Sequence, residues 1–597
     1  MPTTIEVNKQ SVEALLGSGK SKPFVIPEYQ RPYAWTDEQV ETLFEDLWDF
    51  TATSGGTERE SSYFLGSVVS YENEEGEQEI IDGQQRITSL FLLLRAIYTK
   101  LVATPASERT AEANNFIGKI EPTIWRTNKL TGTVDFKNIL LTSRVVNNEG
   151  NEVLRSILET GKADGDAKDN YSNNYRHFQE LFDKHSTENP LMVYQFIYAL
   201  LNQAILLPIT ADTQDTALTI FSTLNDRGLP LSDADIFKAK IYNQLAPDDK
   251  KAFIDRWKDL DEQSTDANES IQQLFYYNMF YYRALDKDTK STTPGVRKYY
   301  AANKFERLYK PELLDTLFVI LNLWKVVNKG EELEDEDWSK NTKIRQTLDI
   351  LTSYPNEFWK YPVVIYYVCY RNEENFETRF ARFLNKLLME LMTKYLMIPT
   401  INAVKPDILK LNSAIVASDI PTFEFKTVDM TQLEPYIQNP NRNAVRMLLK
   451  TLAYEHQDDL LPAKWEIEHI FPQKWQTNYF PDEPDSTIKE KIEHIGNKLP
   501  FEKKLNIVAG NGYFARKKKE YTASSIVITK AMGTSDVMDW NLESITKRDI
   551  RISDEVVNIM NRWNNEYLTV SVSEGKAEEP SEEELAQIEK FKKNGWI

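Results

Sequence analysis

Residues 465–472, Trp-Glu-Ile-Glu-His-Ile-Phe-Pro, predict a short β-strand with a defined end. Apolar and polar side chains alternate from Trp465 to His469, which is the period of a half-buried strand. Such a strand points Glu468 and His469 to opposite faces, and Pro472 ends the pairing. Three of the five histidines lie in or near this region, and histidine transfers protons and binds metals near neutral pH. We therefore expect chemistry here.

Asparagine and basic residues follow this strand in an order that suits phosphodiester hydrolysis. That reaction needs a base for water, a cation for the leaving oxygen and positive charge for the backbone. His469 offers the base, and Asn497 and Asn506 offer neutral oxygen ligands suited to magnesium or manganese. The basic side chains are Lys503, Lys504, Arg516, Lys517, Lys518 and Lys519. The alternative is that His469 is only a structural residue of the strand and that the lysine run is a solvated surface.

The region resembles the His-Asn-His (ββα-metal) nucleases, in the variant whose third position is asparagine. The matching parts are Glu-His-Ile-Phe-Pro at 468–472, Gly-Asn at 496–497, Asn506 and the basic residues before Tyr521. The resemblance implies that His469 is the general base and that Asn497 holds the motif loop and orients His469. It implies Asn506 as a metal ligand, and Glu468 as a second, although the more familiar pattern has aspartate there. It also implies that Lys517 or a neighbour contacts phosphate.

A second candidate site lies in the sequence Ile-Ile-Asp-Gly-Gln-Gln-Arg that ends at Arg86. A buried-looking strand ends in the sharp turn Asp82-Gly83, and a helix begins with Gln84 and Gln85. The free N–H groups and partial positive charge of a helix start favour an anion, and Arg86 adds a bidentate phosphate donor. The arrangement suits a nucleotide phosphate. A turn with Asp82 as helix cap and Arg86 in a structural ion pair is the alternative.

Three N-terminal stretches extend the resemblance to a named family. They are Ile-Pro-Glu-Tyr-Gln-Arg-Pro-Tyr-Ala-Trp at 26–35, Ile-Asp-Gly-Gln-Gln-Arg at 81–86 and Phe-Ser-Thr-Leu-Asn-Asp-Arg-Gly-Leu-Pro-Leu-Ser at 221–232. Together they resemble the N-terminal half of GmrSD-type enzymes, which are modification-dependent (type IV) restriction endonucleases used against phage. With the nuclease motif, the resemblance covers residues 1–245 and 440–560.

This family resemblance implies an N-terminal domain, related to the ParB and sulfiredoxin folds, that binds and hydrolyses nucleoside triphosphate. Its nucleotide site would contain Gln30, Arg31, Asp82, Gly83, Gln84, Gln85 and Arg86. Asn225 and Arg227 either face the same site or only punctuate a helix end. The nuclease would cut foreign DNA with a divalent metal. The DNA modification that is read varies in the family, between sugar-modified hydroxymethylcytosine and phosphorothioate, and the sequence does not choose.

The composition is that of a folded protein with more than one core. The chain has 597 residues, 41% of them hydrophobic and 12% aromatic. We predict a multidomain α+β protein. Its parts are a mixed α/β ParB-like domain at 1–245, a mainly helical connector at 246–440, a ββα-metal nuclease motif within a helical domain at 441–565, and an acidic tail at 566–597.

The charge and the cysteine count limit the partners and the compartment. The single cysteine, Cys369, excludes a disulfide framework and a cysteine-based zinc site, and fits a reducing cytoplasm. No apolar run approaches the about 20 residues that span a bilayer, and the N-terminus is not a signal peptide. We expect a cytoplasmic protein without a membrane partner, with a homodimer as one candidate assembly. The net charge of −20 argues against general adhesion to nucleic acid but allows a local basic site.

Three functions remain open from the sequence. The first is a nucleoside-triphosphate-regulated, metal-dependent endonuclease that cleaves modified phage DNA. The second is a nucleotide-switched DNA-binding defence protein with an inactive nuclease fold, although intact His469, Asn497 and Asn506 argue against it. The third is an RNA-cutting abortive-infection toxin, because the fold alone does not choose between DNA and RNA.

Overall fold

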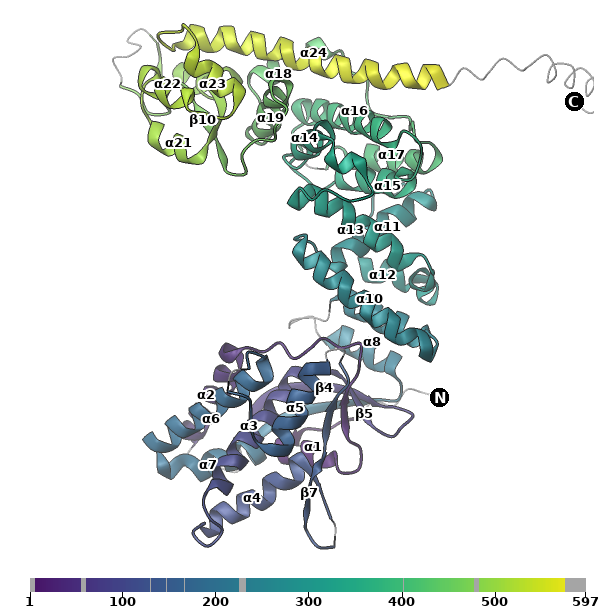
Figure 1. Cartoon of the computed structure of the whole chain (residues 1–597), viewed down its shortest axis with the longest axis vertical. Coiled ribbons are helices and arrows are strands. Elements are labelled where there is room, and N and C mark those ends of the chain that lie inside the picture. The colour runs from purple at the N-terminus through teal and green to yellow at the C-terminus, as the bar shows by residue number, and fades with distance from the viewer. Residues whose placement is uncertain are drawn as a thin grey trace, which may run out of the picture. The chain divides into compact units, whose positions relative to one another are not determined.

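A computed structural model describes residues 6–54, 61–128, 130–145, 148–165, 167–224, 232–400, 402–476 and 483–574. The chain forms two compact units, Met1–Asp259 and Leu260–Ile597. It is α+β and mainly helical, which confirms the predicted class, and Figure 1 shows the elements of each unit. Within the described ranges, no helix is long and apolar enough to cross a membrane. The finer division of the chain into four segments stays a prediction.

The first unit is built on a seven-stranded mixed sheet with the order β1-β9-β4-β5-β3-β8, in which β2 also pairs with β9. The strands are β1 Glu6–Val7, β2 Gln10–Ser11, β3 Phe24–Ile26, β4 Tyr63–Glu72, β5 Gln78–Asp82, β8 Leu141–Ser143 and β9 Ala204–Ala211. Strand β4 runs parallel to β9 and antiparallel to β5, and β3 is parallel to both β5 and β8. A separate hairpin joins β6 Trp125–Thr127 and β7 Val134–Ile139.

Helix α3, Gln84–Ala103, is the central helix of this unit, because its whole middle is buried. Its apolar residues from Leu90 to Leu94 have no exposed surface and belong to one large core. The other helices are α1 Val12–Ser18, α2 Asp37–Ser54, α4 Ala111–Ile124, α5 Asn148–Thr160, α6 Asn170–Glu188, α7 Val193–Tyr198, α8 Gln214–Leu224 and α9 Asp233–Gln244, followed by α10 Pro247–Asp266. Because the middle of α3 is buried in this core, its first turn, which begins at Gln84, has a fixed position next to the sheet.

The second unit begins with helices whose aromatic stripes are buried, as in α11 Ile271–Leu285 and α16 Phe376–Met397. The others in this part are α12 Val296–Ala301, α13 Leu313–Lys329, α14 Thr342–Leu351, α15 Lys360–Tyr370, α17 Lys405–Ala417, α18 Glu434–Gln438 and α19 Val445–His456. Burial of these stripes is what an amphipathic helix gains by packing. The aromatic residues therefore form core.

The last part of the second unit carries the predicted nuclease motif. Strands β10 Trp465–His469 and β11 Lys498–Glu502 pair antiparallel, and helix α21 Lys503–Ala509 follows directly. Around them lie α20 Asp485–Lys491, the short 3₁₀ turn η7 Ile495–Asn497, α22 Phe514–Thr522, α23 Val527–Thr534 and the long α24 Leu542–Glu574. A small core joins these elements, with Phe471, Leu499, Phe501 and Tyr521 among its buried members.

Candidate active site and nucleotide site

His469 is the last residue of β10, where it pairs with Lys498 of β11. Its side chain is 15% exposed, and its Nε2 atom lies 3.4 Å from Glu493 Oε1 and 3.4 Å from Gln473 Nε2. Burial lowers the pKa of His469, whereas Glu493 raises it. Because burial is the larger effect, the imidazole is neutral at pH 7 and can accept a proton.

Glu468 points to the other face of β10, as the alternation predicts. Its carboxylate is 5% exposed and accepts hydrogen bonds from Tyr521 Oη at 2.6 Å and from Lys517 Nζ at 2.7 Å. The Lys517 ammonium also donates to the backbone carbonyl of His469 at 2.5 Å. A carboxylate that is buried and neutralised in this way does not fit a metal ion. The predicted metal-ligand role of Glu468 therefore conflicts with its position.

The basic run of α22 divides between the interior and the surface. Lys517 is 2% exposed and paired, so it does not fit the predicted contact with phosphate. Lys518 donates to the backbone carbonyls of Ser535 and Val537 and so helps to fix the segment after α23. Four cations remain exposed on α21 and α22, namely Lys503, Lys504, Arg516 and Lys519. These four can meet a polyanion.

Asn497 is fully buried and holds the residues that follow His469. Its Nδ2 donates to the carbonyls of Phe471 and Ile492, each at 3.0 Å, and its Oδ1 accepts from Phe471 N at 2.7 Å and from Trp540 Nε1 at 3.2 Å. Its backbone carbonyl also accepts from Ile470 N at 2.8 Å. The amide thus clamps the loop after β10 to Ile492 and Trp540, and none of these hydrogen bonds goes to the imidazole.

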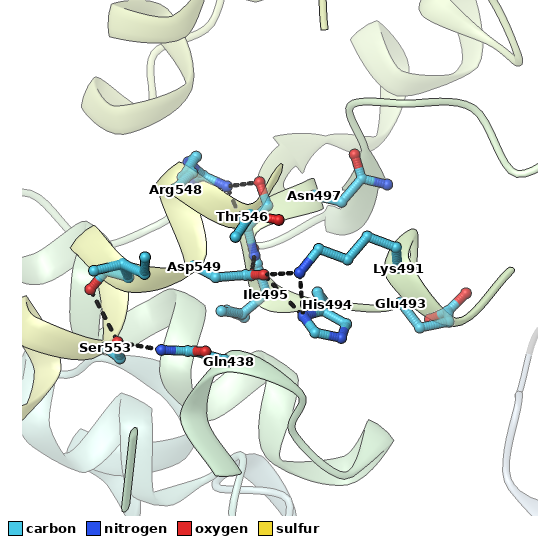
Figure 2. Close-up of polar contacts among 12 residues, drawn as sticks. Gln438, Lys491, Glu493, His494, Ile495, Asn497, Thr546, Arg548, Asp549 and Ser553 are labelled. Atoms are coloured by element: carbon cyan, nitrogen blue, oxygen red, sulfur yellow. Dashed lines mark hydrogen bonds and ion pairs between the residues drawn. The ribbon is translucent and has the colours of Figure 1, made fainter. Parts of the chain in front are cut away.

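Helix α24 closes over η7, and Figure 2 shows the contacts. Asp549, which is 1% exposed, accepts from Gly496 N at 2.7 Å, His494 Nδ1 at 2.8 Å and Lys491 Nζ at 3.0 Å. The preceding residue, Arg548, donates to the carbonyls of Ile495, Gly496 and Lys498. A Cβ atom on Gly496 would lie 2.3 Å from the carbonyl oxygen of Ile545. Glycine is therefore required for the helix to come this close.

Asn506 lies on α21, the helix that follows the two strands and contacts both of them. Its side chain is half-buried, and its amide makes no hydrogen bond within the described part of the chain. The next two residues, Ile507 and Val508, are exposed by 71% and 57%. The amide oxygen of Asn506 is thus available to a ligand from outside the protein.

In the first unit, hydrogen bonds join the two N-terminal motif stretches. Gln30 Nε2 donates to the Ile81 carbonyl at 3.1 Å. Gln85 Oε1 accepts from Ala34 N at 2.7 Å, and its Nε2 donates to the Pro32 carbonyl at 3.1 Å. Gln30 and Gln85 are 3% and 8% exposed. Both side chains therefore join the two motif stretches, and most of their hydrogen-bonding groups are already used within the protein.

The start of α3 offers free backbone groups. Gly83, at φ 88°, caps the helix without a side-chain hydrogen bond, so Asp82 is not the helix cap. Gln84 is 6% exposed, and its Oε1 has no hydrogen-bond partner among the described residues. Together with the exposed Arg31, it lines a small cavity. The cavity as it stands has no room for a ligand, so a bound group would contact Arg31 and the first turn of α3 from the surface.

The two charged residues of this motif are held near the sheet. Arg86 donates to the Ser67 carbonyl at 3.0 Å, and its guanidinium packs on Gly66. Burial raises the pKa of Asp82 above its ordinary value, while the Gly83 N–H, Arg86 and Arg31 act in the opposite direction. Asn225 and Arg227 lie outside the described residues.

Several residues of the nuclease region were missed from the sequence. Glu493, beside His469, directly precedes His494 and could have been found as a carboxylate near a histidine. Arg548, Asp549 and Trp540 lie more than 40 residues after η7 and follow no local pattern. Only the fold brings them to the motif.

Two family models match this chain. The model of the N-terminal domain of the GmrSD restriction endonuclease matches residues 12–242, and that of the C-terminal domain of GmrSD restriction endonucleases matches residues 429–554. A comparison with curated proteins finds no match. The two models cover more than half of the chain and define it as a restriction endonuclease. The chain belongs to the GmrSD restriction endonuclease family, which makes it a DNA endonuclease of phage defence.

Proposed function

We propose that this protein is a nucleoside-triphosphate-regulated, metal-dependent endonuclease that cleaves modified phage DNA, with His469 as general base. The observation that supports this proposal best is the environment of His469. Its neutral imidazole lies at a strand end beside one carboxylate, and the helices α21 and α22 that follow carry exposed cations. That is the combination that base-catalysed cleavage of a phosphodiester needs.

Glu493 sets the role of each nitrogen of the imidazole. The carboxylate beside Nε2 favours the tautomer with the proton on Nε2; the amide nitrogen of Gln473 at the same distance opposes it, but the ionised carboxylate is the stronger partner, which leaves Nδ1 as the base. Water then attacks phosphorus while Nδ1 takes its proton. The bond from phosphorus to the leaving oxygen breaks, and solvent protonates that oxygen. Lys498, whose Nζ lies 2.9 Å from Glu493, holds the carboxylate in place.

A divalent cation, magnesium or manganese, would stabilise the charge on the phosphate and on the leaving oxygen. The described residues contain no group of three or more histidine, cysteine or carboxylate side chains that could hold such an ion. Asn506 fits the ion as a neutral oxygen ligand, and Glu468 does not. Magnesium commonly keeps several waters and shares substrate phosphates, so few protein ligands suffice. We expect the ion to bind firmly only together with DNA.

DNA would lie along the exposed cations of α21 and α22. Lys503, Lys504, Arg516 and Lys519 present positive charge on the two helices next to the strand pair. Backbone contacts of this kind position a duplex without reading its sequence. The chain as a whole carries a net charge of −20, which repels DNA. DNA would therefore bind only at this local basic surface of the nuclease part.

The nucleotide would bind at the start of α3, in a domain related to the ParB and sulfiredoxin folds. Free N–H groups of the first helical turn suit a phosphate, and Gln84 and Arg31 supply further polar contacts. Binding and hydrolysis there would regulate cutting. Gln30 and Gln85 would support the site by joining its two stretches.

A cleavage assay tests the substrate part of this proposal. Purified protein with magnesium or manganese is incubated with unmodified DNA, with glucosylated hydroxymethylcytosine DNA and with phosphorothioate DNA, each with and without nucleoside triphosphate. Selective cutting of one modified DNA supports the proposal, and the nucleotide arms give the sign of the regulation. An RNA arm addresses the toxin hypothesis, and cutting of RNA alone would favour it. No cutting, with DNA still bound, would favour the inactive-nuclease hypothesis.

A further inference from the structure

We infer that Asp549 is a positioning residue of the nuclease, through which α24 fixes the loop that follows His469. The inference rests on the proposed nuclease function and adds to it a residue far from the motif in sequence. Asp549 touches no reacting group. It acts through η7, and η7 acts through Asn497.

Asp549 holds η7 through hydrogen bonds from three donors. One carboxylate oxygen accepts from Gly496 N at 2.7 Å, and the other accepts from His494 Nδ1 and Lys491 Nζ at 2.8 Å and 3.0 Å. With three donors and almost no exposure, this carboxylate is fixed in one orientation. In Figure 2 the side chains of Lys491 and His494 converge on it. The turn before β11 therefore has one supported position.

Asn497 connects η7 to the residues that follow His469. Asn497, the residue after Gly496, binds both backbone groups of Phe471 through its side chain and Ile470 N through its carbonyl. Those two residues directly follow His469. A shift of η7 away from α24 would therefore move the loop that sets where the imidazole lies. Catalytic groups need a placement within about 0.5 Å, which such a chain of buried hydrogen bonds can provide.

Helix α24, which carries Asp549, is itself held in place. Helix α24 is continuous over 33 residues and is held well beyond Asp549. Lys386 Nζ of α16 donates to Asn564 Oδ1 at 2.7 Å, and Tyr567 Oη donates to the Pro421 carbonyl at 2.6 Å. From Asp549 to Tyr567 the helix rises about 27 Å. A helix held over that length offers η7 a fixed surface.

The test compares Asp549→Asn with Asp554→Asn, which makes the same change at an exposed site on the same helix. Two quantities are measured, the steady-state cleavage of DNA and the hydrogen exchange of the amides of Ile470, Phe471 and Gly496. For Asp549→Asn we expect kcat to fall about 10- to 100-fold, as for other residues that orient a catalytic group. We expect a KM within about threefold of wild type and faster exchange at the three amides. Asp554→Asn should match wild type in every measurement.

A normal kcat in Asp549→Asn would overturn the inference, and so would unchanged exchange at the three amides. If Asp549→Asn does not fold, Lys491→Gln removes one charged donor, whose side chain is 21% exposed, and gives the same comparison with a smaller loss. The exchange arm needs no DNA. If the wild-type protein cuts no substrate, the proposed function fails, whereas faster exchange still shows that Asp549 holds the loop.

Discussion

The carboxylate of Glu493 lies 3.4 Å from Nε2 of His469, while Lys498 Nζ lies 2.9 Å from the other oxygen of the same carboxylate. The imidazole is thus oriented by a side chain that the motif does not include. Because the acid is about half exposed, its main effect is on the orientation and pKa of His469 rather than on stability.

Glu493→Gln should change the pH dependence of cleavage. Cutting needs neutral His469, so the rate rises with pH through the pKa of that residue. Glu493 raises this pKa, so its removal should lower the pKa further and move the acid limb to lower pH. The plateau rate should fall about 10-fold, because the ring loses its orienting partner. A pH–rate profile checks both effects, and an acid limb at higher pH would contradict this role of Glu493.

Lys517→Met should destabilise the protein by about 3–5 kcal/mol, because it leaves the buried carboxylate of Glu468 without its ion pair. Urea unfolding of the folded chain measures the change. Lys519→Met, on the same helix but exposed, is the matched control and should stay within about 0.5 kcal/mol of wild type. Equal stability of the two variants would show that the Glu468–Lys517 pair is not needed.

Arg516→Ala should weaken the binding of DNA without affecting folding. Each lost phosphate contact lowers the slope of log K against log salt by about 0.9. Binding is measured at several salt concentrations in a His469→Ala background, so that DNA stays intact. The double variant with Lys503→Ala should lose about twice as much slope. An unchanged slope in the double variant would place the DNA elsewhere.

Gln84 and Gln85 are neighbours with different expected roles. Gln84→Ala should weaken nucleotide binding about 10-fold with little loss of stability, since its Oε1 has no hydrogen-bond partner among the described residues. Gln85→Ala should lower stability by about 1–3 kcal/mol, because the two hydrogen bonds of the buried Gln85 amide to the backbone of Pro32 and Ala34 are lost. Nucleotide titration and thermal unfolding separate the two effects. The reverse pattern would contradict the assignment.

The sequence predicted local structure well where periodicity is strong. The strand from Trp465 to His469 is confirmed, and so are the opposite faces of Glu468 and His469. The helical periodicity of α22 also predicts that Lys517 is buried. Phe514, Lys517 and Tyr521 share the buried face of α22 at helical spacing, a pattern that a run of four basic residues conceals.

The partners that hold η7 could not be predicted in this way. Asp549 and Arg548 lie on α24, an amphipathic helix whose sequence has no motif that marks these two residues. Only tertiary packing brings them to Gly496. Gly496 itself looks like a turn residue in the sequence. Its structural role is to allow α24 to approach, which depends on an element about 50 residues later.

A cleavage assay of wild type, His469→Ala and His456→Ala with magnesium on modified and unmodified DNA tests whether His469 is the general base. His456 is an exposed histidine of the same unit, paired with Glu555, and serves as the control. We predict that His469→Ala loses cutting by at least about 10²-fold but keeps nucleotide hydrolysis, and that His456→Ala behaves as wild type. Cutting by His469→Ala at the wild-type rate would show that His469 is not the general base.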